Sequence, residues 1–137
     1  MTVAEILKHY QLHQTPIRVQ LLEVFLRADR PLSVREIEPL LEQNPDRVTL
    51  YRTLKLFVEK SIVNRIDVSE ALVAYRMNES SQHMHFHCTS CNAVYCLPEV
   101  PIQPVYVPNG FVVTDNRFVV NGVCCRCSDK KGQNDDK

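Results

Sequence analysis

The sequence has 137 residues, enough for one domain or two small ones, and its 45% of hydrophobic residues predicts at least one packed core. The 16 basic residues balance the 16 acidic ones, so the net charge gives no global signature of nucleic-acid binding, and a basic surface could arise only by local clustering. No apolar run is long enough for a transmembrane helix and the N-terminus lacks a signal-peptide pattern, so we expect a cytoplasmic protein without membrane contact.

The first part of the chain has the periodicity and the capping residues of helices. Apolar residues at helical spacing predict a short amphipathic helix over residues 2–12. Thr15 is a typical N-cap and Pro16 a typical first helical residue, so we expect a second helix to begin there and to end before Pro31.

Two further helices are expected to follow. The segment Ser33–Glu36 fits a capping box, which predicts a helix through about residue 43 that Pro39 would shorten or bend. Asp46 is a good N-cap for a fourth helix over residues 47–60, which carries apolar residues on one face and polar residues on the other.

Two β-prone segments, residues 62–67 and 71–76, predict a hairpin after the fourth helix. Helices followed by such a hairpin are the order of a winged helix-turn-helix, in which helix 47–60 would be the recognition helix. Its polar face offers an aromatic ring and cationic donors to bases and phosphates, although the same pattern would also suit a solvated surface. The candidate DNA-contact residues on this helix are Thr49, Tyr51, Arg52 and Lys55.

After a polar linker at residues 78–82 the apolar period changes to two, which is the period of β-strands. Several prolines between residues 98 and 108 exclude a long helix there. We therefore expect an α+β chain with a winged-helix domain at 1–79, a small second domain at 83–128 and a disordered polar tail at 129–137. The predicted strands of the second domain are His83–Cys88, Ala93–Leu97, Phe111–Thr114 and Phe118–Val123.

Four of the six cysteines form two CxxC pairs, and two such pairs brought together make a tetrahedral four-thiolate zinc site. Metal binding in a reducing cytosol is favoured here over disulfides. A domain this small also needs a staple, so we expect one structural zinc per chain. Unpaired buried cysteines and an iron–sulfur cluster are the alternatives, and Cys125 could compete as a ligand. The expected ligands are Cys88, Cys91, Cys124 and Cys127.

Four motifs occur together along the chain. They are Thr15–Arg18, which resembles a TPxR start, Val48–Leu54, which resembles a TVYRxL helix, His83–Cys91, which matches HxHxxCxxC, and Gly122–Cys127, which matches GxCxxC. Each motif alone is weak, but the ordered combination over residues 1–128 resembles the ferric uptake regulator family of metal-responsive bacterial transcription factors.

The resemblance implies a homodimer that binds double-stranded DNA at a palindromic operator. The second domain would be a zinc-stapled α/β dimerisation domain with a three-stranded antiparallel sheet. The resemblance also implies a phosphate contact for Arg18 and DNA contacts for Tyr51 and Arg52. We therefore expect a sequence-specific transcriptional regulator of the repressor type. No nucleophile, base or phosphate-binding pattern indicates an enzyme.

The sequence departs from the family at the sensor site. The family builds this site from the two histidines of HxH, a histidine after the second helix, an acidic residue after the wing and a carboxylate past the second knuckle cysteine. Here the last three positions carry no such ligand, and a cation at the acidic position would repel a bound dication. His83 and His85 are the two histidines of HxH. The third histidine position is Pro31 (or the adjacent Arg30), the acidic position is Arg76, and the last carboxylate position is Cys96.

The remaining sensor residues have three interpretations. His83, His85 and Cys96 could form a softer site for zinc or cobalt, Cys96 could be a redox-sensitive thiol, or the histidines could only pack. In each case we expect DNA binding to depend less on a regulatory metal than in typical relatives. A different class of function is a zinc-stapled protein-interaction module whose winged helix no longer reads DNA.

Overall fold

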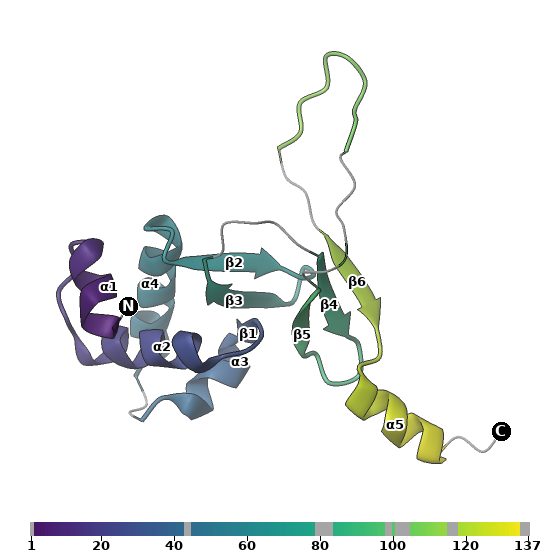
Figure 1. Ribbon diagram of the computed structural model, residues 1–137, viewed down its shortest axis with the longest axis horizontal. Helices are drawn as coiled ribbons and strands as arrows, with labels where there is room; N and C mark the ends of the chain where they lie inside the picture. Colours follow the sequence, from purple (N-terminus) through teal and green to yellow (C-terminus); the bar gives the residue numbers. More distant parts are fainter. Residues whose placement is uncertain are drawn as a thin grey trace. The chain divides into compact units, whose positions relative to one another are not determined.

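A computed structural model shows two compact units, Met1–Glu79 and Ser80–Lys137, which are treated separately below (Figure 1). No helix among the described residues is long and apolar enough to cross a membrane. The structure describes residues 2–42, 45–78, 84–97, 100, 105–114 and 118–134.

The first two helices begin where side chains satisfy their free amide groups. Helix α1 spans Val3–His9 and is closed by a capping box, in which the Glu5 amide donates to the Thr2 hydroxyl at 3.2 Å. Helix α2 spans Pro16–Arg27, and the predicted N-cap at Thr15 is confirmed because its hydroxyl accepts from the backbone of the third helical residue.

The third predicted helix is much shorter than expected. Helix α3 covers only Val34–Ile37 and continues as a single 3₁₀ turn, η1, over Glu38–Leu40. The capping box between Ser33 and Glu36 is present, so the start was predicted correctly. Pro39 explains the early end, because it has no amide hydrogen to continue the α-helical hydrogen-bond ladder.

Helix α4 spans Arg47–Glu59 and agrees closely with the predicted recognition helix. The Asp46 carboxylate accepts a hydrogen bond from the Thr49 amide at 2.7 Å, which confirms the predicted N-cap. Thr53 can lie in the core because its hydroxyl donates to the Thr49 carbonyl oxygen one turn earlier, at 2.8 Å.

The first unit also contains a three-stranded antiparallel sheet in the order β1-β3-β2. The predicted hairpin consists of β2, Val63–Asp67, and β3, Val73–Met77. A third strand, β1 at Leu32–Ser33, was not predicted because two residues are too short for a periodicity signal. Its register with β3 places Leu32 opposite Tyr75.

The core of the first unit joins the helices to the sheet and is nearly all apolar. Its buried members come from all four helices and all three strands of the unit, so α4 is held on its apolar side by the whole unit. The buried residues are Ile6, Leu7, Leu21, Leu22, Phe25, Leu32, Ile37, Leu41, Leu50, Leu54, Phe57, Ile62, Val63 and Tyr75.

The second unit has a three-stranded sheet in the order β5-β4-β6. Strands β4, Met84–Cys88, and β5, Val94–Leu97, are antiparallel, but β6, Val119–Gly122, runs parallel to β4. The sheet is therefore mixed, and the expectation that all its pairings are antiparallel was wrong. A parallel pair must be joined by a crossover of a dozen or more residues, and the chain between the end of β4 and the start of β6 is long enough for one.

Two local expectations for the second unit were also wrong. Residues 111–114 are exposed and form no strand, although their apolar character suggested one. Residues 129–134 of the tail expected to be disordered belong to helix α5, Cys125–Asn134, and residues 135–137 lie outside the described part of the chain. The amide of Ser128 donates to the Cys124 carbonyl oxygen at 2.7 Å, so the turn that holds the second cysteine pair supplies the first turn of the helix and lowers the cost of nucleation.

The ion pair between Arg30 and Glu36 gives a prediction about stability and pH. Burial raises the pKa of Glu36, but hydrogen bonds from Arg30 and from the Ser33 amide outweigh burial and bring it below its ordinary value of 4.5. A lowered folded-state pKa stabilises the fold above the unfolded pKa, and this contribution is lost as the pH falls. We therefore expect wild type to melt at a higher temperature than Glu36→Gln at pH 7. This difference in melting temperature should be smaller at pH 3.5.

Thermal unfolding followed by circular dichroism measures both melting temperatures at each pH. The control is Glu70→Gln, which removes an exposed carboxylate in the loop of the β2–β3 hairpin. A difference between wild type and Glu36→Gln that stays constant between the two pH values would contradict the prediction.

Candidate metal centre

The parallel pairing of β4 with β6 brings the two cysteine pairs together. Cys88 is the last residue of β4 and lies opposite Gly122, the last residue of β6. Cys91 follows in the turn after β4, and Cys124 and Cys127 flank the start of α5. A β-carbon at Gly122 would lie 2.9 Å from Cζ of Phe86, so a larger residue here would require the Phe86 ring to move.

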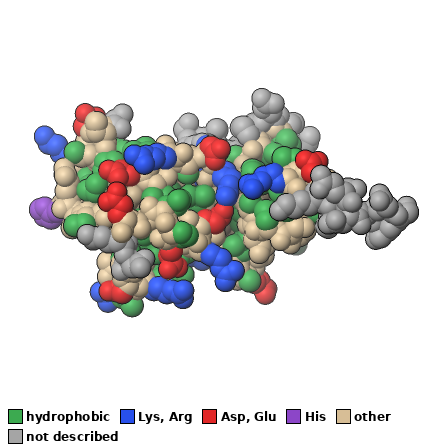
Figure 2. Space-filling model, turned by 90° about the horizontal axis from the view of Figure 1, so that it is seen from below, with side chains coloured by type: hydrophobic (Ala, Val, Ile, Leu, Met, Phe, Trp, Pro, Cys, Tyr) green, Lys and Arg blue, Asp and Glu red, His purple; other side chains and the backbone are tan. Residues whose placement is uncertain are grey.

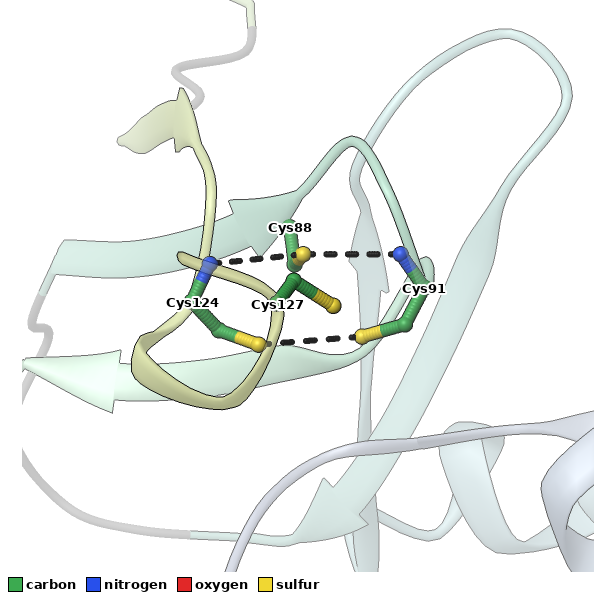
Figure 3. Close-up of side chains that lie close together, drawn as sticks. All are labelled: Cys88, Cys91, Cys124 and Cys127. Carbon is green, nitrogen blue, oxygen red and sulfur yellow. Dashed lines mark hydrogen bonds between the residues drawn. The ribbon is translucent and has the colours of Figure 1, made fainter. Parts of the chain in front are cut away.

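The sulfur atoms of these four cysteines converge on one point (Figure 3). All four Sγ atoms lie within 4.8 Å of one another, and Cys91 Sγ is 3.9 Å from Cys124 Sγ. A disulfide would require about 2.05 Å. Four thiolates at about 2.3 Å from a tetrahedral zinc ion would be separated by about 3.8 Å. The arrangement therefore fits a closed tetrahedral metal site.

Backbone amide groups prepare Cys88 for the thiolate state. The amides of Cys124 and Cys91 each donate to its sulfur at 3.4 Å, and these bonds, the one from Cys124 foremost, lower the pKa of Cys88 to about 6. The pKa of Cys127 is raised to about 12, because its thiol hydrogen-bonds with Cys124 and because burial disfavours the charged thiolate. All four sulfurs could be thiolates together only beside a cation, and a bound metal ion would supply that charge.

The other two cysteines lie outside this cluster. Cys125 is exposed at the first position of α5, so it does not compete with its neighbours as a ligand. Cys96 is half-buried on β5 and lies directly opposite His85 of β4. The remaining sensor candidate, His83, lies outside the described residues.

Two of the positions at which the resemblance led us to expect sensor ligands, Pro31 or Arg30 and Arg76, can be located in the first unit. Leu32 pairs with Tyr75, so one further step along both strands brings Pro31 beside Arg76. Pro31 is buried, and the adjacent Arg30 is paired with Glu36. Neither Pro31 nor Arg30 offers a metal-binding group here, and Arg76 is a cation.

The candidate DNA-contact residues of α4 lie on one solvent-exposed surface. Tyr51 is 50% exposed, and Val48, which the sequence reasoning did not select, is 59% exposed. Arg18 is half-buried at the start of α2, where its guanidinium donates to the His13 carbonyl oxygen at 3.0 Å. The exposed candidates of α4 are Thr49, Tyr51, Arg52 and Lys55.

Charge is not segregated on the face drawn in Figure 2, where basic and acidic side chains are interspersed. Part of the basic charge is also neutralised locally, since Arg65 lies 3.2 Å from Asp67 and Arg47 lies 3.8 Å from Glu38. This face therefore presents no broad basic field to nucleic acid.

Sequence reasoning assigned no role to one polar cluster beside the metal site. His87, the residue before Cys88, is buried between the side-chain amides of Asn92 and Asn121. Its position in an alternating histidine run was the only signal in the sequence, and that signal does not reveal the two partners.

The first unit is a winged helix-turn-helix and the second carries a four-cysteine centre. The chain therefore belongs to the class of winged-helix proteins that carry a second unit with a thiolate metal site. The sequence model of the Ferric uptake regulator family matches residues 9–105, and the chain belongs to this family. The family consists of DNA-binding transcription regulators rather than enzymes.

Named relatives cover nearly the whole chain. The chain is 29% identical over 129 residues to the ferric uptake regulation protein of Bordetella parapertussis, which covers 88% of this chain and 93% of that protein. It is 28% identical over 128 residues to the ferric uptake regulation protein of Bacillus subtilis, with coverages of 85% and 86%.

Solved structures show the same fold. The Vibrio cholerae ferric uptake regulator matches with a TM-score of 0.65 at 20% identity, covering 88% of this chain and 98% of that one. A zinc-bound manganese uptake regulator matches with a TM-score of 0.68 at 19% identity (90% and 99%). A zinc uptake regulator complexed with zinc and DNA matches with a TM-score of 0.61 at 19% identity, covering 94% of this chain and 92% of that one. At these identities the likeness concerns the fold alone.

The cysteine geometry predicts which thiols hold metal. We expect protein purified without added chelator to carry one zinc per chain, and Cys88→Ser to lose it, because three thiolates and a hydroxyl bind zinc far more weakly. Cys125→Ser is the matched control and should keep its zinc, since this sulfur lies outside the cluster. Elemental analysis by plasma mass spectrometry measures the ratio, and equal zinc loss in both variants would contradict the assignment.

Proposed function

We propose that this protein is a cytoplasmic, homodimeric transcriptional repressor that binds a palindromic operator through α4. Each chain would hold one structural zinc ion at its four-thiolate centre. The observation that carries the proposal is the exposed polar face of α4, set on a winged-helix core in a member of a family of DNA-binding regulators. The structure of a zinc uptake regulator bound to zinc and DNA, which shares the fold, also supports a DNA-binding role.

The chemistry of α4 suits direct reading of DNA in the major groove. The first turns of the helix carry Thr49, Tyr51 and Arg52, whose side chains can contact thymine methyl groups, base edges and guanine acceptors. Lys55 lies one turn further and can reach a phosphate. The Asp46 cap and the buried side of the helix keep this surface rigid, which reduces the entropy lost on binding.

Arg18 would position the unit on the DNA backbone. Its hydrogen bond to the His13 carbonyl holds the guanidinium near the N-terminal end of α2, where amide groups also favour a phosphate. With zero net charge and acidic residues interspersed among the basic ones, the protein should show a modest salt dependence of DNA binding.

The apolar segment at residues 105–114 supports the dimer. Tyr106 is 88% exposed, Val112 is 83% exposed and Phe111 is 67% exposed, which is unusual for large apolar side chains in a single chain. A second copy of the chain would cover them. A two-fold dimer presents two copies of α4, and this symmetry calls for a palindromic operator.

Zinc would act as a structural element of the second unit. The buried apolar residues found among the described part of this unit are Ala93, Val94 and the ligands Cys88 and Cys124, which is far less than the core of the first unit. Such a unit depends on metal for stability. All four positions around the ion would be filled by protein, which leaves no open position for catalysis.

The regulatory metal site would be altered or lost. Arg76 and Pro31 supply no ligand where relatives are expected to have one, and the positive charge of Arg76 opposes a dication. His85 and Cys96, which face each other across β4 and β5, would retain at most a softer partial site. Operator binding would then persist without a second metal.

Operator binding can be tested with sites selected from random double-stranded DNA by the full-length protein. We expect a palindromic site, and we expect Tyr51→Ala with Arg52→Ala to lower its affinity by at least tenfold, because a lost bidentate contact alone costs about 1–3 kcal/mol. Lys60→Ala, which removes a charge at the far end of α4, should leave the sequence preference unchanged. Failure to enrich any site would instead favour a protein-interaction module.

The regulatory proposal predicts the response to chelation. A chelator too weak to strip four thiolates should leave operator affinity in an electrophoretic shift assay unchanged, because no second metal holds the DNA-binding form. The zinc content measured in the same samples confirms that the structural site stayed filled. Complete loss of binding that returns on adding iron(II) would overturn the proposal.

A parallel measurement locates any remaining sensor. We expect Cys96→Ser and wild type to carry the same single zinc per chain. A second metal equivalent in wild type that disappears in Cys96→Ser would show that His85 and Cys96 still belong to a sensor site.

A further inference from the structure

His87 is a buried polar side chain in the strand that leads into the first cysteine pair. It is only 9% exposed, and a buried imidazole without hydrogen bonds would cost free energy. Both of its ring nitrogens are engaged: Nδ1 lies 2.9 Å from Asn121 Oδ1, and Nε2 lies 3.1 Å from Asn92 Oδ1. A neutral imidazole donates once and accepts once, and an amide can supply either partner.

The two asparagines belong to the two cysteine knuckles. Asn92 directly follows Cys91. Its backbone N–H donates to the Cys88 carbonyl oxygen at 2.8 Å and closes the first turn. Asn121 lies on β6, opposite His87 in the parallel register, and leads into Cys124 three residues later. His87 therefore links the segments that carry both halves of the metal site.

The backbone at Asn92 indicates that its side chain is placed for this contact. Its φ angle is +64°, in the left-handed region where asparagine is tolerated far better than most residues. Glycine would fit this backbone without strain but would offer no amide to His87. The first turn thus combines a conformation suited to glycine with a side chain that glycine lacks.

We propose that His87, Asn92 and Asn121 form a clamp that sets how tightly the four-thiolate centre retains its metal. His87 acts as a positioning residue and does not touch the ion. By tying the turn after β4 to β6, the clamp keeps Cys91 and Cys124 at the separation that metal binding requires. Residues that orient metal ligands in this way typically change metal affinity by about 10–100-fold when they are replaced.

The test measures the rate at which the zinc-loaded, full-length protein transfers metal to an excess of a colorimetric chelator. We expect His87→Ala, Asn121→Ala and Asn92→Gly each to release zinc about 10–100-fold faster than wild type. Asn92→Gly is the most specific of these variants, because glycine can keep the backbone conformation and the substitution removes only the side-chain amide that contacts His87. Ser90→Ala, an exposed substitution in the same turn, should release zinc at the wild-type rate.

A double-variant cycle separates a clamp from independent effects on stability. Since His87→Ala already removes the bond to Asn121, adding Asn121→Ala should accelerate release no further. Unfolding midpoints measured on the same proteins identify a purely structural role, which would shift the midpoint and leave the release rate unchanged. If His87→Ala does not fold, Asn92→Gly and Asn121→Ala decide the question alone, and wild-type release rates in both would overturn the clamp.

The inference rests on the proposed zinc site, and the two can fail separately. A wild-type protein that carries no metal would overturn the four-thiolate centre and the clamp with it. A wild-type protein with one zinc per chain and unaffected clamp variants would overturn only the role of His87.

Discussion

The parallel pairing of β4 with β6 is the constraint on which the second unit depends. It places Cys88 opposite Gly122, so that residues more than thirty positions apart in the chain reach one metal site. A slip of one residue in this register would turn the following side chains to the opposite face of the sheet and separate the sulfur atoms. The close approach of Gly122 to Phe86, the bond from the Cys124 amide to Cys88 and the start of α5 all follow from the same register.

The two units are stabilised by different physical means. The first has a broad apolar core that buries one side of every long helix, so its exposed α4 surface is rigid without metal. The second buries few apolar side chains among its described residues and gathers four cysteine sulfurs within 4.8 Å of one another. Metal would thus act on the shape of the second unit, whereas the chemistry of DNA contact would lie in the first.

Local chemistry made much of the first unit predictable. Thr15, Ser33 and Asp46 each announce a helix start, because their side chains satisfy amide groups that the helix leaves free. The same reasoning failed where the outcome depends on distant parts of the chain. β1 is too short to give a periodicity signal. Residues 111–114 belong to neither sheet that the described residues form. α5 begins from a turn set by the cysteines.

The sequence by itself determined the ligand types, the spacing within each cysteine pair, the helix starts and the family, because all of these are properties of short segments. The CxxC spacing also indicated the four cysteines, but only the tertiary structure decided that Cys125 stays outside their cluster, because that outcome depends on β4–β6 pairing across a long connection. It also decided that His87 is enclosed by two asparagines that lie five and 34 positions further along the chain. Side chains that meet by folding leave no mark in the spacing of either segment.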